Sequence, residues 1–102
     1  MKKGILELLI LTVLSKKECY GYEIISIITD SGLEISEGSL YSILSKLIDE
    51  KLVFTRLEES NQGGARKYYK LNADGLQKLD KLSSDWKVIS DTIFKLNKLK
   101  YE

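Results

Sequence analysis

The side chains best suited to binding lie on one side of a segment near the middle of the chain. If residues 36–49 form a helix, its polar side is small, with an aromatic ring at its edge: Gly38, Ser39, Tyr41, Ser42, Ser45 and Lys46. Small hydroxylated side chains allow close approach and can hydrogen-bond phosphate oxygens or base edges, and a lysine adds positive charge. The pattern favours binding chemistry, and a solvated polar helix face is the plainer alternative.

A second candidate is a short basic stretch that follows a glycine turn. Arg66, Lys67 and Lys70 lie in a run without acidic residues, just after Gly63 and Gly64. The whole chain has 16 basic and 15 acidic residues, a net charge of +1, so its overall balance does not select nucleic acid as a partner. Only the placement of the charges supports that partner.

Enzymatic chemistry has little support in the composition. The chain has no histidine, and its single cysteine, Cys19, has no imidazole to act as a base. No metal-ligand cluster or phosphate-cradling glycine loop is present in the sequence. We therefore expect neither an enzyme nor a cofactor.

The same cysteine and the start of the chain bear on location. One cysteine allows no intramolecular disulfide, which fits a reducing cytosol. The opening apolar run resembles a signal peptide, but Glu7 interrupts it and it is too short to span a bilayer. We expect a soluble, cytoplasmic protein whose first helix, over residues 5–14, belongs to the core and has no membrane partner.

Three helices and a hairpin are predicted to position the candidate residues. Isoleucines at helical spacing predict a second helix over residues 20–30, which Gly32 would end in a left-handed conformation. Ser36 is a candidate N-cap for the third helix, and Leu40, Ile43, Leu44, Leu47 and Ile48 would be its buried side. Residues 52–58 and 66–71 look extended, with turn residues at 60–64 between them.

A long final helix is predicted from Ala73 onward. Its apolar residues are spaced three and four apart, as in the seam of a coiled coil: Leu79, Leu82, Trp86, Ile89, Ile93 and Leu96. A seam this long, together with an almost wholly apolar first helix, favours a homodimer. The predicted fold is mainly α with a β-hairpin wing: a winged helix-turn-helix domain over residues 1–72, followed by a dimerisation helix over residues 73–102 within the same compact unit.

Three segments give the chain a specific resemblance. YGYEI at Tyr20–Ile24, EGSLYSILSKL at Glu37–Leu47 and QGGARKYYKLNADG at Gln62–Gly75 resemble the PadR family of bacterial transcriptional regulators. The similarity is greatest to short members, which carry one long dimerising helix after the winged domain. Ser42 stands where the family usually has proline, and Asn72 where it usually has threonine.

The resemblance implies roles for individual residues. Ser39, Tyr41, Ser42, Ser45 and Lys46 would face double-stranded DNA, and Gly63, Gly64, Arg66 and Lys67 would form the wing contact. Trp86 would stack a flat aromatic effector at the dimer centre, with Leu8, Leu82 and Ile89 as neighbouring walls, although packing alone explains Trp86 equally well.

The expected function is therefore a homodimeric, DNA-binding repressor that a hydrophobic, aromatic ligand releases from an inverted-repeat operator. The alternative is a winged-helix module that binds protein instead of DNA. A protein-binding surface should be apolar at its centre. Here those positions carry serines, glycine and lysine, which favours DNA.

Overall fold

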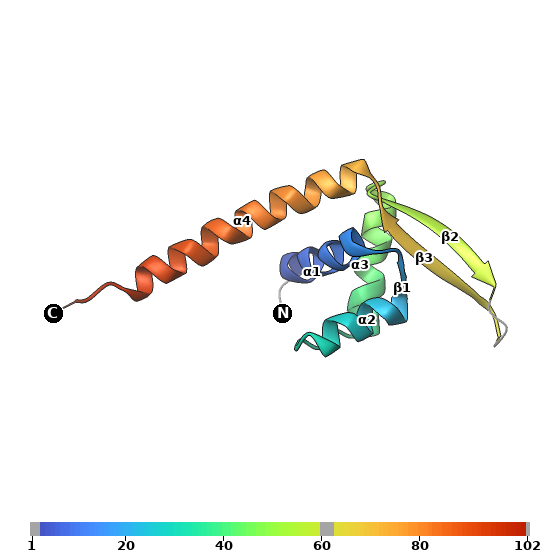
Figure 1. Ribbon diagram of the computed structural model, residues 1–102, viewed down its shortest axis with the longest axis horizontal. Helices are drawn as coiled ribbons and strands as arrows, with labels where there is room; N and C mark the ends of the chain where they lie inside the picture. Colours follow the sequence, from blue (N-terminus) through green and yellow to red (C-terminus); the bar gives the residue numbers. More distant parts are fainter. Residues whose placement is uncertain (1–2, 60–62, 102) are drawn as a thin grey trace.

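The computed structural model describes residues 3–59 and 63–101 of the chain. Its elements in chain order are α1 (Lys3–Lys16), β1 (Cys19–Tyr20), α2 (Gly21–Asp30), α3 (Glu37–Asp49), β2 (Val53–Glu59), β3 (Ala65–Leu71) and α4 (Ala73–Asn97). The first three helices cluster beside the sheet, and α4 runs away from them (Figure 1). The molecule is elongated as a result, measuring 66 × 27 × 20 Å.

Local signals in the sequence set the ends of the helices. The Ser36 hydroxyl accepts a hydrogen bond from the Ser39 amide at 3.1 Å, which confirms it as the N-cap of α3. Gly32 has a φ of 112° just beyond α2, as expected for a helix terminator. Asn72 caps α4 by accepting from the Gly75 amide at 2.9 Å, so a non-threonine residue fills this position well.

The core lies where α1, α2 and α3 meet the base of the sheet. The predicted apolar side of α3 is buried at four of five positions, and the fifth, Ile48, is half-buried. Ile10 and Leu11 of α1 and Ile24 of α2 are fully buried against it. Cys19 is also buried as a free thiol and acts as a small apolar side chain. This packing fixes α3 with its polar side outward.

The sheet has one more strand than the sequence predicted. The order is β1-β3-β2, all antiparallel, and β1 pairs Cys19 with Tyr69 and Tyr20 with Tyr68. A two-residue strand is too short to show an alternating pattern, which is why it was missed. Gly63 and Gly64 both have positive φ, at 103° and 95°, in agreement with the predicted turn; the other turn positions, 60–62, lie outside the described residues.

The long helix α4 has two halves with different surroundings. Near its start, Gly75 is buried so close to the Leu52 carbonyl that a methyl group there would collide with it. Leu79 and Leu82 then pack against the core of their own chain. From Trp86 onward the apolar side chains are exposed. No helix among the described residues is both long enough and apolar enough to cross a membrane.

Candidate nucleic-acid interface

The polar side of α3 lies on the surface, as the sequence predicted. Tyr41, Ser42, Ser45 and Lys46 are exposed, and Ser39 is half-buried beside the N-cap, where its hydroxyl accepts from Ser36 at 3.0 Å. Ser42 and Ser45 present small hydroxyls with no bulky side chain between them. This part of α3 can therefore approach another surface closely.

The start of α3 and the wing share one hollow. The space, about 540 Å³, lies between the start of α2, the start of α3 and β3, and its lining is Tyr20, Gly21, Tyr22, Tyr41, Ala65, Arg66, Lys67 and Tyr69. Tyr41 belongs to the predicted third helix and Arg66 and Lys67 to the predicted second strand of the hairpin, and the fold brings the two elements together at this hollow. Four tyrosines and two cations make this hollow polar and basic.

A stack of rings and cations holds the wing against β1. The rings of Tyr20 and Tyr68 meet edge to face, with centroids 5.4 Å apart. The Arg66 guanidinium lies 4.6 Å from the Tyr20 ring centroid, and the Arg56 guanidinium lies 4.4 Å from that of Tyr68. Tyr68 is half-buried and Tyr69 is buried, so both rings pack in the structure.

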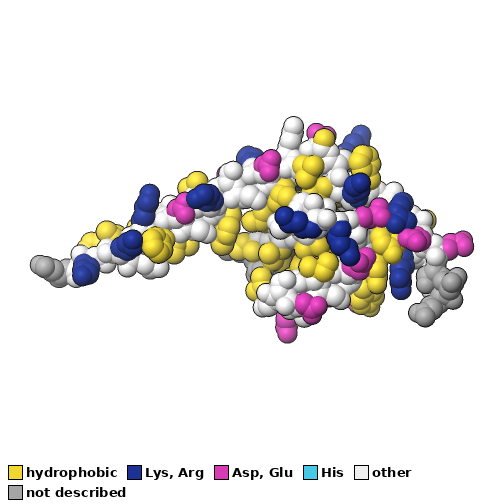
Figure 2. Space-filling view, in the orientation of Figure 1, with side chains coloured by type: hydrophobic (Ala, Val, Ile, Leu, Met, Phe, Trp, Pro, Cys, Tyr) yellow, Lys and Arg dark blue, Asp and Glu magenta, His cyan; other side chains and the backbone are white. Residues whose placement is uncertain are grey.

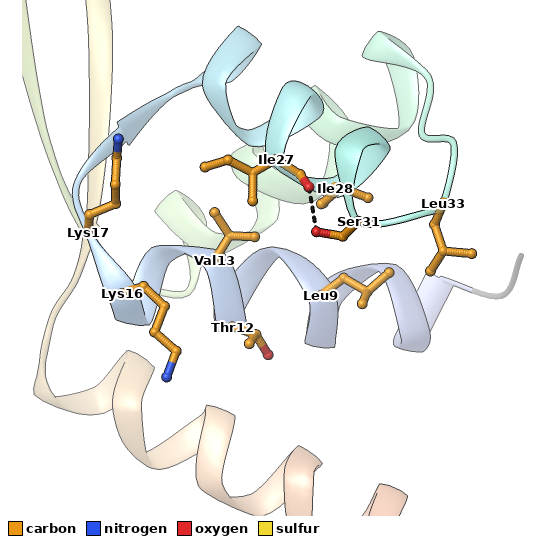
Figure 3. Close-up of a pocket in the computed structure, with 9 residues that line it drawn as sticks. All are labelled: Leu9, Thr12, Val13, Lys16, Lys17, Ile27, Ile28, Ser31 and Leu33. Carbon is orange, nitrogen blue, oxygen red and sulfur yellow. Dashed lines mark hydrogen bonds between the residues drawn. The ribbon is translucent and has the colours of Figure 1, made fainter.

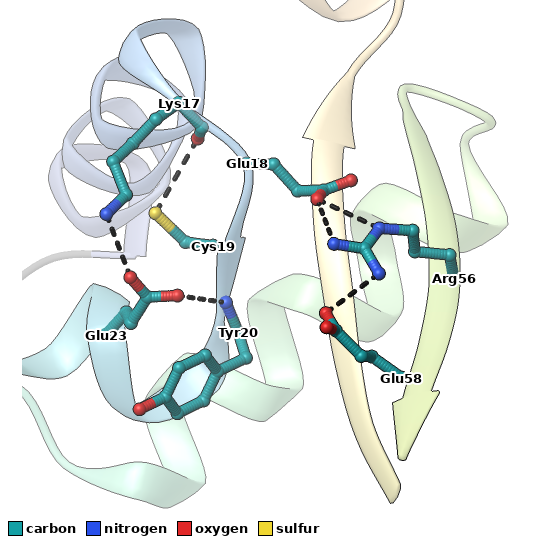
Figure 4. A network of polar contacts seen from close by, with 7 residues as sticks. All are labelled: Lys17, Glu18, Cys19, Tyr20, Glu23, Arg56 and Glu58. Atoms are coloured by element: carbon teal, nitrogen blue, oxygen red, sulfur yellow. Dashed lines mark hydrogen bonds and ion pairs between the residues drawn. The ribbon is translucent and has the colours of Figure 1, made fainter. Parts of the chain in front are cut away.

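Carboxylates engage Arg56 but not the next arginine along the wing. Arg56 binds Glu18 through Nε at 2.9 Å and Glu58 through Nη1 at 2.9 Å (Figure 4). These two acids raise the pKa of Arg56, and Arg56 in turn lowers that of Glu18. Arg66 forms no ion pair with any residue that the structure describes. Arg66 is thus the wing arginine whose charge is available.

Charge elsewhere on the surface is mixed in sign. Basic and acidic side chains alternate over the wing strands and along α4 on the face shown in Figure 2. This distribution agrees with the net charge of +1. The availability of particular cations therefore decides the interface more than a broad basic patch does.

Lys46, which is predicted to face DNA, forms a salt bridge with a buried glutamate on its inner side. Its ammonium lies 2.8 Å from Oε2 of Glu7 in α1 and 3.9 Å from Glu50. Lys78 of α4 reaches the same cluster, 2.7 Å from Oε1 of Glu7 and 3.1 Å from Glu50. Lys46 is 43% exposed, so it stays at the surface, but Glu7 already neutralises part of its charge.

Glu7 itself is a buried acid. Its residue is 5% exposed, and its Oε1 accepts no hydrogen bond from the described residues although the Lys78 ammonium is close. Burial would raise the pKa of the Glu7 carboxyl, but the hydrogen bond from Lys46 and the charges of both lysines outweigh burial and lower it. A charged Glu7 thus joins α1, α3 and α4.

The predicted ligand residues also lie together. Trp86, Leu8, Leu82 and Ile89 all line a hollow of about 340 Å³ between α1 and α4, joined by Gly4, Ile5 and Asp85. Trp86 is 44% exposed and Ile89 50% exposed, so no other side chain of the same chain covers this part of the hollow. The hollow is apolar except for the Asp85 carboxylate.

A further apolar groove runs between α1 and α2, which the sequence did not predict. It has a volume of about 320 Å³, and Leu9, Val13, Ile27 and Leu33 are among the side chains that line it (Figure 3). It shares no residue with the Trp86 hollow. The apolar residues of α1 are therefore only partly covered by their own domain.

Three helices, a hairpin wing and a small polar recognition surface define this chain as a winged-helix protein. The sequence model of the transcriptional regulator PadR-like family matches residues 10–81, and the chain belongs to that family. It is a DNA-binding transcriptional regulator, and since the family is one of transcription factors it is not an enzyme.

Solved structures share this fold over nearly the whole chain. A PadR-like transcriptional regulator from Bacillus cereus is 36% identical, with 96% of each chain covered and a TM-score of 0.83. A PadR family transcriptional regulator from Eggerthella lenta is 28% identical, covers 95% of this chain and 85% of that one, and has a TM-score of 0.86. An uncharacterized protein of Lysinibacillus sphaericus is 31% identical over 94 residues, which is 89% of this chain and 86% of that protein.

Sequence reasoning missed the contribution of α2 to the basic hollow. Tyr20, Gly21 and Tyr22 belong to a segment that carried the family resemblance but received no role. Two tyrosines around a glycine at a predicted helix start were the available signal. Only the tertiary structure places them opposite Arg66.

Proposed function

We propose that the protein acts in the cytoplasm as a homodimeric repressor that binds an inverted-repeat operator. The observation that supports a dimer is the exposed apolar side of α4, where Trp86, Ile89, Ile93 and Leu96 are each 44–57% exposed. Exposed apolar stripes of this length mark interaction surfaces, and equivalent helices of two copies would cover each other. The half-covered residues of α1 add to this surface.

In such a dimer the two copies of α3 would enter adjacent major grooves. Two-fold symmetry requires half-sites about 34 Å apart, one turn of duplex, and an operator of matching symmetry. Ser42 and Ser45 would approach base edges and phosphates, and the wing would follow the backbone through Arg66 and Lys67. Recovery of the DNA that the protein binds in cells, followed by sequencing, tests this proposal. Enrichment of inverted repeats near promoters is expected, and recovery of no specific fragment would refute it.

A negative charge placed on α3 should weaken this binding without unfolding the protein. Ser45→Glu adds a carboxylate to an exposed position, so we expect a loss of about 10- to 100-fold in affinity for the recovered fragment, because the carboxylate would face phosphates. Ser84→Glu adds the same charge on the exposed polar side of α4 and serves as the control. Electrophoretic mobility shifts measure both, and equal affinities for the two variants would exclude α3 as the DNA-contacting helix.

Release from DNA is proposed to begin at the Trp86 hollow. An aromatic compound stacked there, between α1 and α4, would change the angle between the two winged domains and thus the spacing of the recognition helices. The Glu7 cluster supports this route, since Lys78 of α4 and Lys46 of α3 bind the same carboxylate. A displaced α4 therefore acts directly on α3.

Planar aromatic dyes should quench the fluorescence of Trp86. The chain has one tryptophan, so the signal reports this site alone. Quenching that saturates with added dye, together with weaker DNA binding, is the expected result. Leu82→Ala, which enlarges the hollow without touching the wing, is expected to change the dye affinity. An absence of quenching at high dye concentration would reduce Trp86 to a packing role.

A further inference from the structure

We propose that the hollow between α2, α3 and β3 seats one backbone phosphate of the DNA, with Arg66 and Lys67 as its cations, Tyr41 as a hydroxyl donor and Tyr20 as a positioning residue. The inference rests on the proposed binding of DNA by α3 and the wing. It adds a specific site and assigns a role to the start of α2. Neither the predicted wing contact nor the polar side of α3 requires such a site.

The two cations reach the hollow already held in place. Successive residues of a strand point to opposite faces, so Arg66 and Lys67 approach the hollow from the two faces of β3. Arg66 lies over the Tyr20 ring at 4.6 Å, and the Lys67 ammonium lies 5.8 Å from the centroid of the buried Tyr69 ring. The planar Arg66 guanidinium over a ring keeps its N–H donors at the rim free, and the Lys67 ammonium, at 5.8 Å from its ring centroid, keeps its three donors.

Two other cations near the wing base are already neutralised. Lys17 pairs with Glu23 at 2.9 Å, and Arg56 pairs with Glu18 and Glu58. Among the described residues, neither Arg66 nor Lys67 has a carboxylate partner. Two cations that line a single hollow and have no ion-pair partner among the described residues suit an anion, and a phosphate diester is the anion that a DNA-binding wing meets.

The neutral groups of the hollow fit the same ligand. Gly21 is buried against the end of the Tyr41 side chain, and a methyl group on Gly21 would collide with the Tyr41 hydroxyl. Because residue 21 is a glycine, the Tyr41 hydroxyl has room to lie in the hollow that Arg66 and Lys67 also line. On the outer side, a hydrogen bond with Glu37 raises the pKa of the Tyr22 hydroxyl, so the Glu37 carboxylate lies beside Tyr22 at the edge of the hollow.

A scan with neutral phosphates tests the seat. In a duplex carrying the recovered operator, single phosphates are replaced in turn by uncharged methylphosphonates, and the affinity of the native protein is measured. We expect one position per half-site at which the replacement weakens binding about tenfold. In the Arg66→Gln variant the same replacement should have almost no further effect, since the partner of that phosphate is already gone.

Two pairs of tyrosine variants separate positioning from packing. Tyr41→Phe should weaken DNA binding several-fold, and replacing the same phosphate by a methylphosphonate should then weaken it no further. Tyr101→Phe changes an exposed tyrosine far from the hollow and should have no effect on binding. Tyr20→Phe keeps the ring beneath Arg66 and should bind as the native protein does, but Tyr20→Leu should behave like Arg66→Gln.

The outcomes distinguish the two levels of the proposal. Normal binding by native protein, loss with Ser45→Glu and no phosphate coupled to Arg66 would overturn the seat and leave the DNA-binding function standing. No binding of any duplex at low salt would overturn both.

Discussion

Replacing Ile93 with aspartate is expected to convert the protein from a dimer into a monomer and to abolish tight operator binding. Ile93 is 51% exposed in the single chain, at the centre of the exposed part of the α4 seam. Each copy would lose the burial of one isoleucine, about 2–3 kcal/mol, and a symmetric dimer contains two copies. The dimer dissociation constant should therefore rise by roughly a thousandfold or more.

Sedimentation at micromolar concentrations, followed by operator titration, measures this effect. A monomer engages a single half-site and loses the advantage of two linked contacts, so its affinity should fall by at least about 100-fold. Ser84→Asp introduces the same charge nine residues earlier, about two and a half turns away and thus on the opposite side of α4. That variant should remain dimeric. A native protein that sediments as a monomer would contradict the proposed dimer outright.

Replacing Glu7 with glutamine is expected to lower the free energy of unfolding by about 1–3 kcal/mol at neutral pH. The Glu7 side chain is 6% exposed and neutralises two lysines, so the variant leaves both cations next to an uncharged amide. The loss stays below that of a fully buried pair, because the Lys46 and Lys78 side chains are 43% and 25% exposed and can turn toward water. Urea unfolding at fixed protein concentration measures it.

The effect of Glu7 should disappear in acid. Its pKa is lower in the folded protein than in the unfolded chain, so its stabilisation is complete above the ordinary glutamate pKa of about 4.3 and is lost as the pH falls through the lower folded value. Native and Glu7→Gln proteins should therefore differ at pH 7 and converge toward pH 3. Asp91→Asn breaks an exposed pair with Lys87 and should change stability by less than about 0.5 kcal/mol. A difference between native and Glu7→Gln that does not change between pH 7 and pH 3 would exclude the charge as its cause.

Periodic patterns and capping residues were sufficient to predict most elements from the sequence alone. The apolar spacing of α3, its Ser36 cap and the left-handed Gly32 are local features, and local sequence determines them. The same holds for the small hydroxyls on the outer side of α3. A strand as short as β1 has no such signal, because pairing with β3 alone makes it a strand.

Contacts between distant residues were decided by the tertiary structure. Glu7 and Lys46 are 39 positions apart, and a lone acid in an apolar helix gave no indication that two lysines would bury it. Likewise, the sequence predicted one continuous apolar seam along α4. In the structure Leu79 and Leu82 pack against the core of their own chain, and only the part from Trp86 onward is exposed. Sequence spacing determines which side of a helix a residue occupies; how the helices pack determines what that side meets, and therefore which charges remain available for DNA.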